Sequence, residues 1–146
     1  MSIFTKPSSV AGGSYFKPKE HESAIAILIE PKSIQKDVPN TYKGITSNRD
    51  EVTARITVFN DQAALSNGTP SAEFDSAKIT HGMLARAAER VIGGAMVARL
   101  EMIETQRGAG WAFQDVDGEV EAKAGEYYTK REEALAAAVS SAPGDF

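Results

Sequence analysis

The chain of 146 residues contains no cysteine. A disulfide framework, a thiol nucleophile and a thiolate metal site are therefore excluded. Histidine is scarce as well: His21 and His81 are the only two, and neither belongs to an H-E-x-x-H motif or another metal-ligand spacing. The sequence also has no Walker lysine and no G-x-S-x-G motif. Because no catalytic pattern is present, we predict a protein that is not an enzyme and needs no cofactor or metal ion.

Long apolar runs are also missing. The longest run, 24–29, is far too short to cross a bilayer. The first 14 residues carry a single lysine and no apolar segment that could serve as a secretory signal. We therefore expect a cytoplasmic protein with no membrane partner.

Positive charge is not in excess, since 16 Lys and Arg stand against 20 Asp and Glu and the net charge is −4. This balance excludes a chain coated in positive charge, as a histone-like DNA compactor would be. A local basic groove is still allowed, because the release of counterions depends on the cations in contact and not on the total charge.

What the chain does contain is enough apolar sequence for one domain, with 42% hydrophobic residues. Residues 1–15 are rich in Ser, Gly and Pro and are expected to form a flexible N-terminal arm. Residues 16–138 are expected to form the domain, and residues 139–146 a flexible tail.

The segment 52–59 alternates strictly, with apolar residues at every second position. This period of two predicts a strand with one buried face and one face in water. The face predicted to be exposed to solvent carries Arg55 and Phe59. A cation and an aromatic ring on one strand face suit a surface that holds a nucleic-acid backbone and stacks its bases. An ordinary solvated strand can carry the same residues.

The remaining pattern predicts five strands, at 24–29, 51–59, 74–80, 95–104 and 111–116, with polar loops over 36–48 and 60–71. A period near 3.6 predicts a helix over 82–92, and a second helix follows Asp117. This order favours a mainly β (α+β) fold, a five-stranded OB-like barrel with a helix between strands three and four and a C-terminal helix. An SH3-like barrel or a small sandwich also uses five short strands, but neither places a helix at 82–92 as naturally.

In such a barrel the usual binding surface is the face of strands two and three with the loops beside it. Cations there would neutralise phosphates and aromatic rings would stack bases, with little selectivity for sequence. Phe74 is expected to share this face with the lysine of the third strand. For Trp111, a core pair with Phe113 is the stronger alternative. The predicted nucleic-acid-binding residues are Arg55, Phe59, Lys78, Tyr42, Lys43, Arg49, Arg99, Arg107 and Trp111.

Several short segments resemble the small single-stranded-DNA-binding-like proteins of actinobacterial phages. They are Phe16–Glu20, Ala26–Pro31, Asp37–Tyr42, Asp50–Val52, Met96–Leu100 and a glycine loop before Trp111. The resemblance spans residues 16–135. It implies an OB-like fold and a role in phage DNA replication or recombination in the host cytoplasm. The implied partner is single-stranded DNA, and a homo-oligomer is compatible with it.

A second hypothesis belongs to another class, a phage structural or assembly protein such as a virion decoration protein. In that case the exposed apolar residues of the strands, Phe59, Phe74, Val97 and Ile103, would form a protein interface. The sign of the charge over the face of strands two and three separates the two hypotheses, because DNA binding requires that it be positive.

Overall fold

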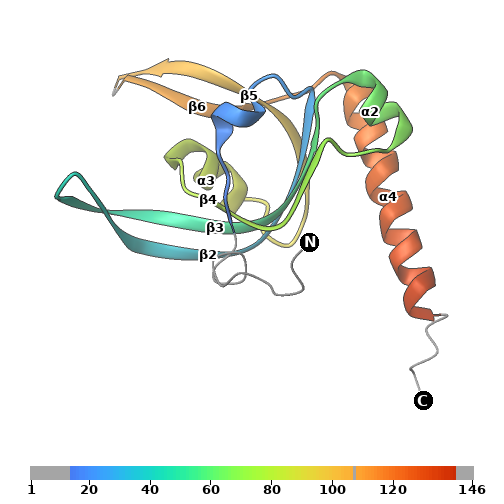
Figure 1. Cartoon of the computed structure of the whole chain (residues 1–146), viewed down its shortest axis with the longest axis horizontal. Helices are drawn as coiled ribbons and strands as arrows, with labels where there is room; N and C mark the ends of the chain where they lie inside the picture. The colour runs from blue at the N-terminus through green and yellow to red at the C-terminus, as the bar shows by residue number, and fades with distance from the viewer. Residues whose placement is uncertain (1–13, 107, 141–146) are drawn as a thin grey trace, which may run out of the picture.

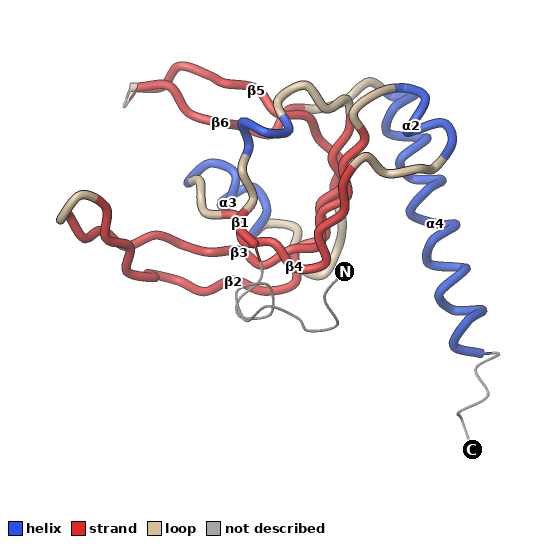
Figure 2. The backbone as a smooth tube through the Cα atoms, in the orientation of Figure 1, coloured by secondary structure: helices blue, strands red, loops and turns tan. Residues whose placement is uncertain are grey.

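The computed structural model describes residues 14–106 and 108–140, which form one strongly curved sheet with helices on both of its faces (Figures 1 and 2). The sheet order is β1-β4-β3-β2-β5-β6, in which five strands are antiparallel and the two-residue β1 runs parallel to β4. The strands are β1 Ser14–Tyr15, β2 Ala26–Tyr42, β3 Ile45–Phe59, β4 Ala72–Ile79, β5 Met96–Thr105 and β6 Gly108–Gln114. The helices are the 3-10 helix η1 Pro18–His21, α2 Gln62–Asn67, α3 Gly82–Glu89 and α4 Gly118–Ser140.

The mainly β class is confirmed, but the closed barrel is not. Within the described residues β4 and β6 are not paired with each other, so the sheet stays open between them. The expected helix between the third and fourth long strands is α3, which ends three residues before the predicted end. The expected C-terminal helix is α4, whose first turn includes a hydrogen bond from the Glu121 amide to the Asp117 carbonyl.

Two predicted loops are wrong. Most of 36–48 is strand, because β2 and β3 continue through it and turn only at Lys43 and Gly44, both with positive φ. Both faces of this hairpin are largely in water, so the sequence there shows no alternation of apolar and polar residues. The 60–71 segment contains α2, which Asp61 caps by accepting a hydrogen bond from the Ala64 amide and which ends at Gly68 with φ 64°.

The ends of the chain differ slightly from the expected domain limits. Ser14 and Tyr15, the last residues of the expected arm, form β1 on the edge of β4. At the other end α4 continues to Ser140, past the expected end of the domain. The rest of the expected arm and tail, residues 1–13 and 141–146, lies outside the described residues.

The main core fills the inner side of the curve. Ile27, Ile29, Val52 and Ile56 are fully buried there. Helix α3 lies within the curve (Figure 2) and adds Leu84 to the same cluster. Because the core fills this face over most of β2, β3 and β4, the outer face of these strands offers more room for polar side chains.

A second, smaller core covers one end of the outer face. Helices α2 and α4 lie over it (Figure 1), and Phe59 is fully buried there together with Leu65 and Val120. The ring of Tyr127 meets Phe59 edge-on at 5.1 Å between centroids. The prediction that Phe59 is exposed and stacks on a base is therefore wrong. Alternation identifies the two faces of a strand, but it does not show that helices cover part of the second face.

Phe74 also lies on a different face from the one predicted. A register shift between Ala54 and Ile56 gives β4 an extra residue, so Phe74 pairs with Ile56 on the buried face while Lys78 pairs with Thr53 on the outer face. Period-two reasoning placed both on one face because the bulge is invisible in the sequence.

Aromatic side chains bridge the opening between β6 and β4. The ring of Phe16 lies 6.4 Å from Phe113 of β6 and stacks on His21 at 5.4 Å, and His21 meets Phe74 of β4 edge-on at 5.6 Å. The segment around η1 thus joins β6 and β4, which do not pair with each other within the described residues.

We expect Phe59→Ala to lower the free energy of unfolding by about 3–5 kcal/mol, because it opens a cavity under α4. Urea unfolding measures the change. Tyr42→Ala, at an exposed hairpin tip, is the control and should stay within about 0.5 kcal/mol of wild type. A loss for Phe59→Ala no larger than for Tyr42→Ala would contradict this packing.

Stability should also depend on pH through His21. Burial lowers the pKa of His21 below 6.5, against the opposing charge of Glu20. Since the folded pKa is the lower one, the contribution of neutral His21 is present above pH 6.5 and is lost as the pH falls below it. Urea unfolding between about pH 7.5 and pH 5.5 should therefore show a steeper loss for wild type than for His21→Phe. Equal slopes would rule out this role for His21.

Candidate nucleic-acid interface

The part of the outer face that α2 and α4 leave uncovered carries a cluster of charged side chains around one tyrosine. We call this cluster the outer-face patch. Its members come from β1, β2, β3 and β4, four strands that are neighbours in the sheet. They are Tyr15, Lys32, Arg49, Glu51, Arg55 and Lys78.

Glu51 organises one half of the patch. Its side chain is only 6% exposed, and its carboxylate oxygens lie 3.5 Å from the Arg49 guanidinium and 3.5 Å from the Lys78 ammonium. Both cations also lie over the ring of Tyr15, at 5.5 and 5.7 Å from its centroid. One carboxylate thus positions two cations beside a half-exposed ring. Such a group can contact phosphate and stack a base.

Tyr15, Lys32 and Glu51 are the members that the sequence did not reveal. Tyr15 lies in the expected arm, and it reaches the patch only because β1 pairs with β4. Lys32 lies at a register shift between Pro31 and Ser33, and its ammonium donates across β3 to the Asp75 carbonyl at 3.3 Å. The strand pairing brings both residues to the patch, and no local pattern indicates either.

Arg55 is half-buried at the centre of β3 and lies opposite Glu30 in register. Glu30 is engaged elsewhere, by the Arg131 guanidinium at 2.5 Å. Within the described residues Arg55 forms no ion pair and no hydrogen bond, so its charge is available to an anion.

The patch gathers four cations although the net charge of the whole chain is −4. They stand against Glu51 within the patch, the exposed Asp75 of β4, and Glu30, which lies opposite Arg55 but binds Arg131. The positive charge that DNA binding requires of this face stays a prediction.

Tyr42 and Lys43 are exposed, but they lie at the far tip of the β2–β3 hairpin and not in the patch (Figure 1). The Lys43 ammonium lies over the Tyr42 ring at 5.4 Å. Tyr42 is 69% exposed and Ile45 beside it is 72% exposed. The tip therefore offers an aromatic and apolar surface on the same two strands as the patch.

Arg99 and Trp111 of the β5–β6 hairpin are not brought to the patch. The Arg99 guanidinium donates to the Asp115 carbonyl at 3.2 Å and pairs with Glu101 at 3.4 Å. Trp111 and Phe113 are half-buried and pack against the main core, as the core alternative predicted. Arg107 lies outside the described residues.

Lys36, which the sequence placed in the loop beside the binding surface, has acidic partners instead. Its ammonium contacts Glu89 of α3 at 2.9 Å and Asp50 at 3.4 Å. The hydrogen bond to Glu89 raises the pKa of Lys36, and a hydrogen bond from the Asp37 amide lowers the pKa of Asp50. This group ties the hairpin to α3 and leaves little free charge.

Metal sites, membrane-spanning helices and similarity to known proteins were each considered as guides to function. Within residues 14–106 and 108–140, no group of three or more His, Asp or Glu side chains is placed to hold a metal ion. None of the described helices is both long and apolar enough to span a membrane. No family model, no curated protein and no solved structure matches the chain. The patch itself is therefore the basis on which a function can be proposed.

We expect Glu51→Gln to lower the free energy of unfolding by about 1–2 kcal/mol, because Arg49 and Lys78 lose the buried carboxylate that holds them together. Urea unfolding at low salt measures the change. Glu101→Gln is the matched control: its pair with Arg99 is about half exposed on both sides, so the loss should be below about 0.5 kcal/mol. Equal losses in the two variants would show that Glu51 does not organise the patch.

Proposed function

We propose that this protein binds single-stranded DNA without catalysing a reaction, and that the strand crosses the outer-face patch. The observation that carries the proposal is the placement of Arg49 and Lys78 over the ring of Tyr15, with Arg55 on the same uncovered face of an acidic protein. In this arrangement the cations contact successive phosphates, and Tyr15 offers its half-exposed ring to a base. Tyr42 would give a second ring farther along the same hairpin.

The proposed binding is weakly selective for sequence. Cations contact phosphates, which carry no sequence information, and an aromatic ring stacks on any base. Affinity should therefore depend strongly on salt. Four phosphate contacts correspond to a slope of about −3 in a plot of log K against log salt for a single strand.

The strand order supports a distant relation to the OB-like barrel. The five long strands follow one another as β4-β3-β2-β5-β6, with α3 between the third and fourth of them along the chain. OB-folds are partly open Greek-key barrels. We propose that this sheet is a version opened between β4 and β6, with Phe16 and His21 in the opening. A role in phage DNA replication or recombination in the host cytoplasm is the setting that fits this proposal.

A phage structural or assembly protein remains the second candidate, now on different residues. The interface first expected for it relied on Phe59 and Phe74, which lie in the cores. The exposed Tyr42 and Ile45 at the hairpin tip favour it instead, because large apolar side chains in water often mark a contact with another protein. Such a contact, including one between copies of this chain, would show in the solution mass without DNA.

We expect Arg55→Gln combined with Lys78→Gln to weaken binding to a poly-dT oligonucleotide by about tenfold or more at low salt. The salt slope should become shallower by about 1.4, because two phosphate contacts are lost. Fluorescence anisotropy at several salt concentrations measures both quantities.

The matched control is Arg86→Gln combined with Arg90→Gln, which removes the same charge from α3 and the residue that follows it, on the opposite face of the sheet, and should leave the slope unchanged. If wild type fails to bind poly-dT at low salt, or if both double variants lose equal affinity, the proposal is wrong.

A further inference from the structure

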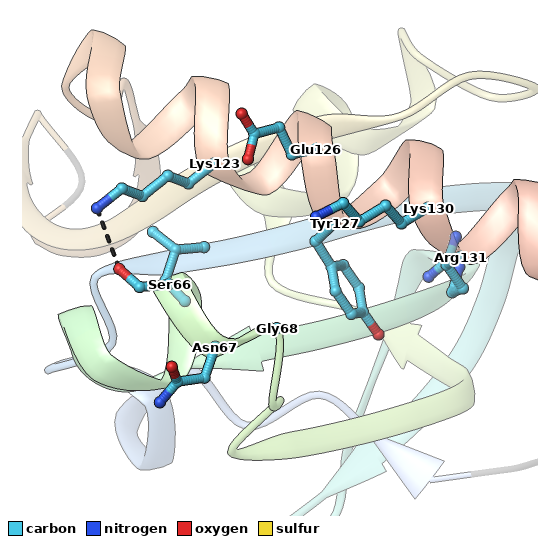
Figure 3. Close-up of a pocket in the computed structure, with 9 residues that line it drawn as sticks. Ser66, Asn67, Gly68, Lys123, Glu126, Tyr127, Lys130 and Arg131 are labelled. Atoms are coloured by element: carbon cyan, nitrogen blue, oxygen red, sulfur yellow. Dashed lines mark hydrogen bonds between the residues drawn. The ribbon is translucent and has the colours of Figure 1, made fainter.

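Polar side chains in the pocket of about 430 Å³ between α2 and α4 find partners within the protein (Figure 3). The Lys123 ammonium donates to the Ser66 hydroxyl at 3.0 Å. Arg131 pairs with Glu30 and Glu132. The free side of β6 is different, because within the described residues this strand pairs only with β5. The backbone N–H and C=O groups on the free side of an edge strand can pair with a strand of another chain.

Among the sheet edges of the described residues, β6 is the one without a feature that prevents pairing. Natural edge strands are protected by charged side chains, proline, bulges or a covering segment. The edge of β4 is covered by β1 and carries Glu73, Asp75 and Lys78. The parts of β2, β3 and β5 that extend beyond their neighbours carry charged residues, and β2 also contains two prolines. In contrast, the seven residues of β6 include no charged residue and no proline.

An apolar row leaves the core beside this edge. Alternation and register place two pairs on one face of the β5–β6 hairpin, Leu100 with Phe113 and Met102 with Trp111. Leu100 is 5% exposed, whereas Met102 is 48% exposed and Trp111 is half-buried. Large apolar side chains in water beside an unpaired edge indicate a surface that another strand can cover.

We infer that β6 pairs antiparallel with β6 of a second copy of this chain, so that two sheets join in a twofold dimer. A second copy fits this edge because strands without charge meet without repulsion. An antiparallel pair of identical strands also satisfies the twofold symmetry of a closed dimer.

The register follows from the part of β6 that is free. The ring of Phe16 lies 6.4 Å from Phe113 at the C-terminal end of β6, so residues 108–112 are the ones available for pairing. A pair centred on Gly110 places Trp111 opposite Ala109 of the second copy. The large ring then packs over a small side chain, next to Met102.

The contact is small, and it leaves the outer-face patch free. Pairing along residues 108–112 lies at the low end of specific interfaces, so we expect dimers at concentrations of about 10–100 μM. The twofold axis of an antiparallel strand pair is perpendicular to the sheet, so the outer faces of both copies lie on the same side. The dimer does not require that the patch binds DNA.

Sedimentation velocity of the full chain without DNA, from about 1 μM to about 500 μM, tests the inference. We expect the mass to rise from that of one chain to that of two. Trp111 is the only tryptophan, so its emission should shift to shorter wavelengths over the same range as its ring is covered. Amide hydrogen exchange along 109–111 should become slower as the concentration rises.

Ala109→Glu should weaken the dimer by about tenfold or more, because it places a carboxylate against Trp111 of the second copy. Ala63→Glu is the matched control, since it adds the same charge at an exposed position in the first turn of α2. Ile45→Lys alters the other exposed apolar contact, at the tip of the β2–β3 hairpin. Both of these variants should form the dimer as wild type does. Urea unfolding checks that Ala109→Glu is folded, and the hydrogen exchange of wild type needs no substitution.

The inference is overturned if wild type keeps the mass of one chain at about 500 μM, or if Ala109→Glu forms the dimer as well as wild type does. Loss of association in Ile45→Lys but not in Ala109→Glu would place the contact at the hairpin tip and also overturn it. Species larger than two chains would contradict a closed pair, in which each copy uses its only free β6 edge. Because no DNA is present, these outcomes are independent of the proposed function.

Discussion

The packing of α4 and α2 on one end of the sheet determines which polar side chains of β3 reach water. The core and α3 occupy most of the inner face of the sheet, so the polar side chains at the centre of β3 lie on the outer face. Phe59 and Thr57 lie beneath the helices and are fully buried, whereas Arg55 lies beyond them and is half-exposed. The outer face of β3 is therefore part of the second core where the helices cover it and a charged surface where they do not.

Within that surface, a buried carboxylate controls the arrangement of the cations. Arg49 and Lys78 belong to adjacent strands and would repel each other without Glu51 between them. The ring of Tyr15 adds a second attraction to both cations, and it is available because β1 attaches to the edge of β4. Glu51 thus neutralises part of the positive charge of Arg49 and Lys78 and holds both cations in place on the surface of an acidic protein.

A second carboxylate also holds a cation at the end of the outer face that the helices cover. There Glu30 binds Nη2 of Arg131, and the buried Nε and Nη1 of Arg131 have no hydrogen-bond partner. Glu30 lies opposite Arg55 of β3 in register and binds the buried Arg131 of α4. The carboxylate that faces Arg55 across the two strands is therefore engaged by a helix packed on the same face.

The sequence by itself determined the number and approximate positions of the long strands, the helix after the third of them and the helix after Asp117. These elements follow from local periods of two and 3.6 and from a capping residue, which do not depend on the rest of the chain. It also identified Arg55 and Lys78 as cations of one sheet face, since a strand's faces follow from alternation, whereas it placed Arg49 in a loop beside that face. Only the tertiary structure decided that Phe59 is buried, that Phe74 faces the core and that Tyr15 and Lys32 join the patch. A covering helix, a bulge and a parallel edge strand cause these differences. Each depends on contacts between residues far apart in the chain, which no local pattern contains.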